Sequence, residues 1–304
     1  MDNTHIHHFK TWLKRLGYSD NTIIRYTSGL TFFIKWLTGE NITHSSQITH
    51  ETLLHYKSHL EKCKNQNTGR GLSQNYILYR FNIIRLFNQY LQHYGEPSFF
   101  NYPIYIPHEK TNSITFLSQQ EIKQLYHESL DNITGYRDRA ILSLLYGCGL
   151  RINEATALLV EDINHAKEVL YVRAAKNYKS RYVPMSTKVK QDLQHYVQYS
   201  RSLLLGEQEN KSFLLSTKKG RSLKSYGIND RLKILAQRAG LQKRIHAHIL
   251  RHSIATHLLQ EGMPLEDIQH FLGHNSIEST EKYAQAKFSN AETRTAGAEK
   301  LRLR

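Results

Sequence analysis

The chain has 304 residues, a length that accommodates two domains with hydrophobic cores of their own, and its 41 Lys and Arg outnumber its 26 Asp and Glu. The formal net charge of +15 is spread over both halves of the sequence and predicts a polyanionic partner that both domains contact. Because there are only two cysteines, Cys63 and Cys148, and no apolar run of membrane-spanning length, the composition excludes a disulfide framework and a membrane protein and indicates the reducing cytoplasm.

Residues 1–95 show helical periodicity throughout. Apolar side chains recur at steps of three and four residues over 23–37 and again over 77–91, which is typical of helices with one buried face, and a third helix is expected at about 50–62. Gly17 ends an earlier helix, and the polar run SDNT that follows can cap the next one. We therefore predict a small helical bundle over residues 1–95.

The helical period disappears over residues 96–115. This segment contains three prolines, as extended linkers do. Ser118 and Glu121 then form the two ends of a capping box that opens a new helix. The sequence therefore predicts a linker over 96–115 and a second domain over 116–289.

After that first helix, the second domain continues with a strongly apolar helix at 136–147, which GCGLR interrupts before helix resumes at 153–159. The strand-like runs VEDI, EVLYVR and SRYVP predict a small three-stranded antiparallel sheet. Further helices are expected at about 187–203 and 225–239. The predicted fold class is mainly α with a small antiparallel β-sheet.

The stretch from His246 to Tyr283 contains the residues with the clearest chemistry. His248 and Arg251 in HILR are three apart, so on a helix they lie on one face, where an imidazole and a guanidinium can grip an oxyanion. A second helix, PLEDIQHFL, ends in a glycine and places His274 in the following turn. Tyr283 follows in a polar setting, where a tyrosine has little core to fill, and is the candidate nucleophile.

HxxR followed by LGH and by a tyrosine resembles the C-terminal signature of the tyrosine recombinases, the phage integrase and Xer group. That family also has an arginine at a glycine-rich helix junction, matched here by Arg151 in GCGLR, and a lysine in a β-turn, matched by Lys176 in VLYVRAAKNYKSRYVP. The stretch LGYSDNTIIRYTSGLTFFIKWL is similar to the family's N-terminal core-binding domain, a SAM-like helical bundle. The resemblance implies six catalytic residues, namely Arg151, Lys176, His248, Arg251, His274 and Tyr283.

Cleavage of a phosphodiester by tyrosine needs stabilisation of the extra negative charge on phosphorus. Two arginines suit that task, because each permanent cation can bind two phosphate oxygens in a fork. The resemblance implies that Lys176 protonates the leaving 5′ oxygen, that His248 helps to deprotonate Tyr283 or holds the phosphate, and that His274 bonds a non-bridging oxygen. It implies a 3′-phosphotyrosine intermediate, and neither metal nor ATP is required.

Several residues allow other interpretations. Arg151 could be a structural ion pair with Glu154, and we expect Glu154 to pair with it as a supporting residue that orients it; Asp162 is a second candidate for such support. Lys179 and Arg181 share the turn of Lys176 and could supply the acid instead. His248 and His252 are spaced like a zinc-binding pair, but HILRH lacks the glutamate of the zinc protease motif and its central arginine would repel a cation.

The predicted function is site-specific DNA recombination by tyrosine-mediated cleavage and rejoining. By resemblance, four protomers act on two double-stranded DNA sites with inverted repeats, through a Holliday junction. Residues 290–304 form a tail that could dock on a neighbouring protomer as a helix. The rivals are a type IB topoisomerase-like enzyme and a catalytically silent DNA-binding accessory protein.

Overall fold

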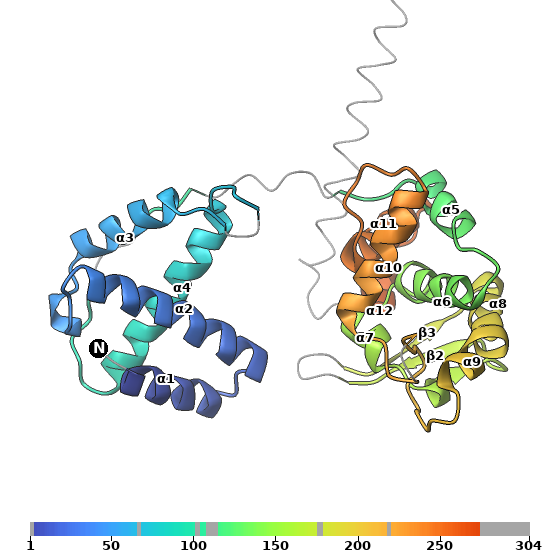
Figure 1. Ribbon diagram of the computed structural model, residues 1–304, viewed down its shortest axis with the longest axis horizontal. Helices are drawn as coiled ribbons and strands as arrows, with labels where there is room; N and C mark the ends of the chain where they lie inside the picture. The colour runs from blue at the N-terminus through green and yellow to red at the C-terminus, as the bar shows by residue number, and fades with distance from the viewer. Residues whose placement is uncertain are drawn as a thin grey trace, which may run out of the picture. The chain divides into compact units, whose positions relative to one another are not determined.

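The computed structural model describes residues 3–65, 68–100, 104–107, 115–174, 179–217 and 220–273. The chain divides into two compact units, residues 1–111 and residues 112–304, which are described separately. Both units are mainly helical (Figure 1). No helix in the described part of the chain is long and apolar enough to cross a membrane.

The first unit is built from amphipathic helices with polar caps. Ser19, Thr49 and Ser73 each accept a hydrogen bond from the backbone N–H three residues later, which satisfies a donor that the first helical turn leaves open. The elements, drawn in blue to cyan in Figure 1, are α1 (Asn3–Arg15), α2 (Asp20–Gly39), the 3₁₀ turn η1 (Ser45–Gln47), α3 (His50–Lys62) and α4 (Gln74–His93).

Aromatic rings fill the core of this bundle. Phe9 and Phe87 meet edge to face with ring centroids 5.5 Å apart. The same core continues past α4, because Phe99 and Ile106 are buried in it and the side chain of Asn88 accepts the Phe99 N–H at 3.0 Å. The segment expected to be a linker therefore begins with residues that pack on the bundle.

The second unit places a small sheet beside packed helices. Its elements before the sheet are α5 (Gln119–His127), α6 (Ile133–Leu142), the π-helical turn η2 (Ser143–Gly147), α7 (Ile152–Ala157) and the 3₁₀ turn η3 (Val160–Asp162). The elements after it are α8 (Thr187–Tyr196), the π turn η4 (Val197–Arg201), α9 (Ser202–Leu205), α10 (Ser225–Arg238), α11 (Ala247–Gln260) and α12 (Leu265–Leu272).

The predicted three-stranded antiparallel sheet is confirmed, in the order β1 (Ile163–Asn164), β2 (Val169–Val172), β3 (Arg181–Pro184). Tyr171 pairs with Tyr182 across β2 and β3. The expectation of a strand over VEDI is wrong for its first three residues, which form η3. The Asp162 carboxylate accepts the Leu159 N–H at 2.8 Å and closes that turn locally.

The break at GCGLR brings the chain close to α12. Gly149 has φ of 59°, and a Cβ there would come within 2.8 Å of the Leu272 side chain and 2.9 Å of Phe271. A larger residue would therefore be strained in conformation and would collide with α12. At the other side of this contact, Gly273 ends α12 in the left-handed conformation, with φ of 66°.

Candidate active site

Arg151 stands at the N-cap of α7 and is tied to Glu154 twice. Its backbone N–H donates to Oε2 of Glu154 at 2.9 Å, and its Nη1 donates to Oε1 at 2.9 Å. Its Nη2 also donates to the backbone carbonyl of Gly273 at 3.0 Å. The first turn of α7 thus fixes the carboxylate, and the carboxylate fixes the guanidinium.

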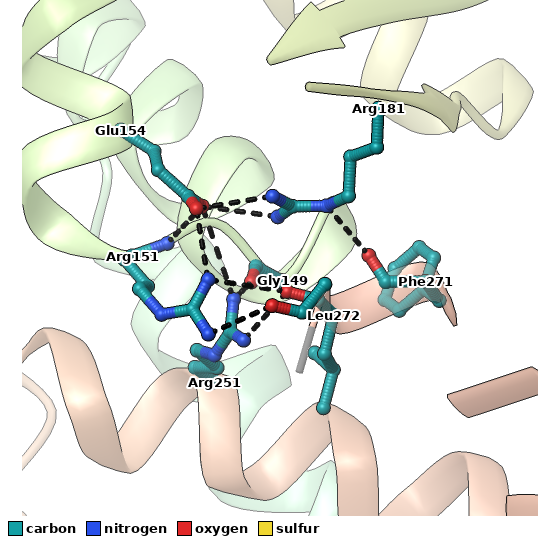
Figure 2. A network of polar contacts seen from close by, with 8 residues as sticks. Gly149, Arg151, Glu154, Arg181, Arg251, Phe271 and Leu272 are labelled. Carbon is teal, nitrogen blue, oxygen red and sulfur yellow. Dashed lines mark hydrogen bonds and ion pairs between the residues drawn. The ribbon is translucent and has the colours of Figure 1, made fainter. Parts of the chain in front are cut away.

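Arg251 comes from the middle of α11 and reaches the same place. It is 3% exposed. Its Nη1 donates to the carbonyl of Gly149, and its Nη2 donates to the carbonyl of Leu272 at 2.7 Å. Nη1 of Arg151 lies 3.5 Å from the same Leu272 carbonyl, so the two guanidiniums converge at the C-terminal end of α12 (Figure 2).

Arg181, at the start of β3, is a third guanidinium in this cluster, and its place in the sequence, in the turn of Lys176, suggested only an alternative acid. Its Nη1 and Nη2 donate to the two carboxylate oxygens of Glu154 at 3.0 Å each, and its Nε donates to the carbonyl of Phe271 at 3.2 Å (Figure 2). One signal was present in the sequence. Arg181 lies two residues before Val183, and side chains two apart on a strand share a face, which here is the buried one.

Glu154 is the only carboxylate drawn among the three guanidiniums in Figure 2, and its nearest distance to Arg251 is 3.9 Å. Burial favours the neutral form of this carboxyl, but the hydrogen bonds and charges of Arg181, followed by those of Arg151, outweigh burial and hold its pKa below the ordinary value of 4.5. Glu154 is therefore ionised at neutral pH. Three cations and one anion leave a net positive cluster, which suits a phosphate.

His248 lies in the first turn of α11, one turn before Arg251. Burial is the main cause that lowers the pKa of its imidazole from 6.5, and the charges of Arg251 and Arg151 lower it further. The ring is therefore neutral at pH 7 and can accept a proton. It lines a cavity of about 250 Å³ together with Arg151 and Glu154.

His248 also lines a larger hollow of about 920 Å³. Lys233 from α10 and the pair Lys243 and Arg244, which precede α11, contribute cations to its wall. Asp230 is the acidic residue in that wall. Lys243 is paired with Glu121 at 2.8 Å, so Lys233 and Arg244 are the cations that outnumber Asp230, and the balance of charge in the hollow favours an anionic ligand.

The remaining predicted site residues are placed as follows. Asp162 pairs with Arg173, whose Nε lies 3.1 Å from each carboxylate oxygen. Asp162 thus bonds Arg173 and the Leu159 N–H, whereas it is Glu154 that bonds Arg151, through two hydrogen bonds. Lys179 is exposed. The predicted residues Lys176, His274 and Tyr283 lie outside the described residues.

Metal binding by the histidines was the alternative for this part of the chain. His248 and His252 have ring centroids 6.3 Å apart. Within the described ranges, no group of three or more His, Cys, Asp or Glu side chains is arranged to hold a metal ion.

Known proteins resemble the chain over most of its length. The model of the phage integrase family matches residues 115–290. The tyrosine recombinase XerC of Oceanobacillus iheyensis is 31% identical over 87% of this chain and 85% of that protein, and XerC of Bacillus subtilis is 30% identical over 88% and 86%. In fold, the chain is similar to the XerH site-specific recombinase in a complex with its palindromic difH substrate, with a TM-score of 0.74 and 19% identity over 91% of this chain and 80% of that one.

The chain belongs to the phage integrase family. Its class is that of the tyrosine recombinases, which break and rejoin DNA strands. Within that class the chain is Xer-like. The predicted activity, site-specific recombination by tyrosine-mediated cleavage, is confirmed, and neither the topoisomerase nor the silent accessory protein is favoured.

Proposed function

We propose that Arg151 and Arg251 hold the scissile phosphate of a double-stranded DNA substrate in this enzyme. The observation that carries the proposal is the convergence of the two guanidiniums beside Glu154, from α7 and α11, at the end of α12. A trigonal bipyramidal phosphorane carries more negative charge on its non-bridging oxygens than the ground state does. Fixed guanidinium donors therefore stabilise the transition state more than the substrate.

The remaining positions complete the reaction. The Tyr283 oxygen attacks phosphorus and loses its proton, for which the neutral His248 imidazole is the acceptor. As the bond to the 5′ oxygen breaks, Lys176 gives that oxygen a proton, and His274 bonds a non-bridging oxygen. The product is a 3′-phosphotyrosine, which a 5′ hydroxyl of another strand attacks in the reverse sense to release the tyrosine.

The basic hollow beside His248 supports a path for the duplex. Lys233 and Arg244 line it, so a phosphate backbone that passes His248 would meet further cations there. XerH, which shares the fold, is described with a palindromic substrate. We propose that this enzyme likewise acts in the cytoplasm on paired inverted repeats, as a tetramer on two sites.

We propose the following division of labour along the chain. Residues 1–95 form a core-binding domain that grips DNA, residues 96–115 link it to a catalytic domain at 116–289, and residues 290–304 dock on a neighbouring protomer. The net charge of +15, spread over both halves of the sequence, supports a clamp that contacts DNA from both domains.

The test has two steps. The wild-type chain first selects its binding site from random-sequence DNA, and covalent trapping is then measured on a nicked duplex that carries the selected inverted repeat. The wild-type chain should form a covalent adduct at the nick. Tyr283→Phe should bind the duplex and form none, because only the nucleophilic oxygen is removed. Tyr182→Phe, which changes a tyrosine that is 70% exposed, is the matched control and should form the adduct. An adduct with Tyr283→Phe would refute the assignment.

A further inference from the structure

The side chain of Arg181 is largely enclosed by the protein. The side chain is 10% exposed, and its partners are both oxygens of Glu154 and the carbonyl of Phe271. Gly273 packs against it so closely that a Cβ at that position would lie 2.8 Å from Nη1. The guanidinium of Arg181 therefore acts through the groups that it bonds directly, the Glu154 carboxylate and the Phe271 carbonyl.

The chief neighbour is also the partner of the two arginines proposed to hold phosphate. Glu154 lies 2.9 Å from Arg151 and 3.9 Å from Arg251, yet its two shortest contacts with Arg181 use both of its oxygens at once. A bidentate pair is the stronger geometry for a carboxylate and a guanidinium. Arg181 therefore takes the largest share of the charge of Glu154.

The pairing of Arg181 with Glu154 changes the net charge of the cluster. With Arg181 present, three guanidiniums and one carboxylate sum to +2; without it, the sum falls to +1, and the carboxylate can pair only with Arg151 and Arg251 in this cluster. The Glu154 carboxylate would then partly neutralise Arg151 and Arg251, and less positive charge would face the phosphate. Replacing Glu154 by a neutral residue in the same variant would return the sum to +2.

We propose that Arg181 is a positioning residue of the phosphate site, which engages the Glu154 carboxylate and so keeps Arg151 and Arg251 charged toward the scissile phosphate. This rests on the function proposed above. Arg181 also ties three site elements together, because it begins β3, bonds the carboxylate held by α7 and bonds a carbonyl of α12.

The variants are Arg181→Met, which keeps much of the length and removes the charge, and Arg181→Met with Glu154→Gln, in which the amide oxygen can still accept the Arg151 N–H. Adduct formation is timed on the nicked duplex at saturating protein. A second duplex has a methylphosphonate at the scissile position, which is neutral because a methyl group replaces one non-bridging oxygen.

Arg181→Met should slow cleavage of the phosphate by about 10- to 100-fold, since it weakens groups that stabilise the transition state without removing them. It should slow cleavage of the methylphosphonate much less, because that substrate needs less positive charge. The double variant should recover most of the rate on phosphate.

Arg231→Met is the matched control. It breaks another bidentate pair of the same unit, in which Arg231 donates to Asp138 at 2.9 and 2.6 Å and the carboxylate is 1% exposed. It should lower the melting temperature but slow both substrates by the same factor. Where Arg181→Met does not fold, Arg181→Gln takes its place, because its amide also removes the charge while its NH₂ group can still donate to Glu154; adding Glu154→Gln should again raise its rate.

Equal losses on the two substrates, or a double variant no faster than the single one, would overturn the inference and reduce Arg181 to a packing role. Failure of the wild-type chain to form any adduct would overturn the proposed function and this inference together. An adduct with the wild-type chain combined with no recovery in the double variant would overturn the inference alone.

Discussion

Glu154→Ala removes the carboxylate that lies among three guanidiniums. The side chains of Glu154 and Arg181 are 10% exposed and that of Arg251 is 4% exposed, so the charges left behind are poorly solvated. Breaking a buried ion pair by removing one partner costs about 3–5 kcal/mol, and we expect about 3 kcal/mol because the arginines keep carbonyl partners. In a unit the size of residues 112–304, this corresponds to a fall of about 6–12 °C in melting temperature.

Inorganic phosphate should reverse much of that loss. Without the carboxylate, the cluster of guanidiniums is an anion site, so phosphate binds the folded variant better than the unfolded chain. A phosphate concentration about 100 times its dissociation constant stabilises the folded state by about 2.7 kcal/mol, close to the expected loss. The assay is thermal unfolding in phosphate against chloride at equal ionic strength, with wild type and Glu154→Gln for comparison.

Asp192→Ala is the control for this effect. Asp192 is also buried, with its side chain 3% exposed, but its partners are the Ser143 hydroxyl at 2.6 Å and the single cation of Lys188. This variant should be destabilised without gaining a response to phosphate. The reasoning about Glu154 is refuted if Glu154→Ala melts with the wild type, or if phosphate raises its melting temperature no more than it raises that of Asp192→Ala.

The same carboxylate gives a sign to the dependence of stability on pH. Its pKa is lower in the folded state than the ordinary value of 4.5, so its contribution to stability is fully present above pH 4.5 and is lost as the pH falls through the folded value. Glu154→Gln has no carboxyl to protonate. The stability difference between wild type and Glu154→Gln should therefore shrink below pH 4.5, in denaturant unfolding at a series of pH values.

Two further predictions concern the chemistry. Burial, with the charges of Arg251 and Arg151, lowers the pKa of His248 below 6.5. The rate of adduct formation, measured against pH, should therefore stay level down to pH 6.5 and fall only as the pH drops through the lower pKa of this imidazole. His248→Asn should remove that fall in rate from the profile. Lys176→Ala should slow cleavage of ordinary DNA far more than cleavage of a 5′-phosphorothiolate substrate, whose sulfur leaves without protonation. Equal losses on both substrates would move the acid role to Lys179 or deny it.

Local signals were enough to predict the parts of the site that neighbour each other in sequence. The spacing of Arg151 and Glu154, three residues apart at the start of a helix, is that of a capping pair, and the structure shows the expected contact. His248 and Arg251 share a helix face for the same periodic reason. The strands on either side of Lys176 follow from their alternating pattern, and the sheet they predicted is present.

The role of Arg181 depends on contacts that no local pattern encodes. Glu154 and Arg181 are 27 positions apart, and Phe271 follows Arg181 after a further 90. The inward face of β3 marks Arg181 as a buried charge in need of a partner but does not identify the partner. Similarly, VEDI has the composition of a strand, but the Asp162 carboxylate closes a turn there by accepting the N–H of Leu159.

One carboxylate among three guanidiniums would make the proposed phosphate site rigid before the phosphate arrives. Three unpaired cations would repel one another, and the cost of confining them would fall on folding. Glu154 lowers that cost and is itself held by the Arg151 N–H, so the orientation of its charge is set by the backbone of α7. Since the cluster stays net positive, the carboxylate fixes the arginines without cancelling the charge that a phosphorane needs. The proposed site needs both fixed arginine side chains and a net positive charge. We expect that removing Glu154 chiefly loosens the arginine side chains, whereas removing Arg181 chiefly lowers the positive charge of the cluster.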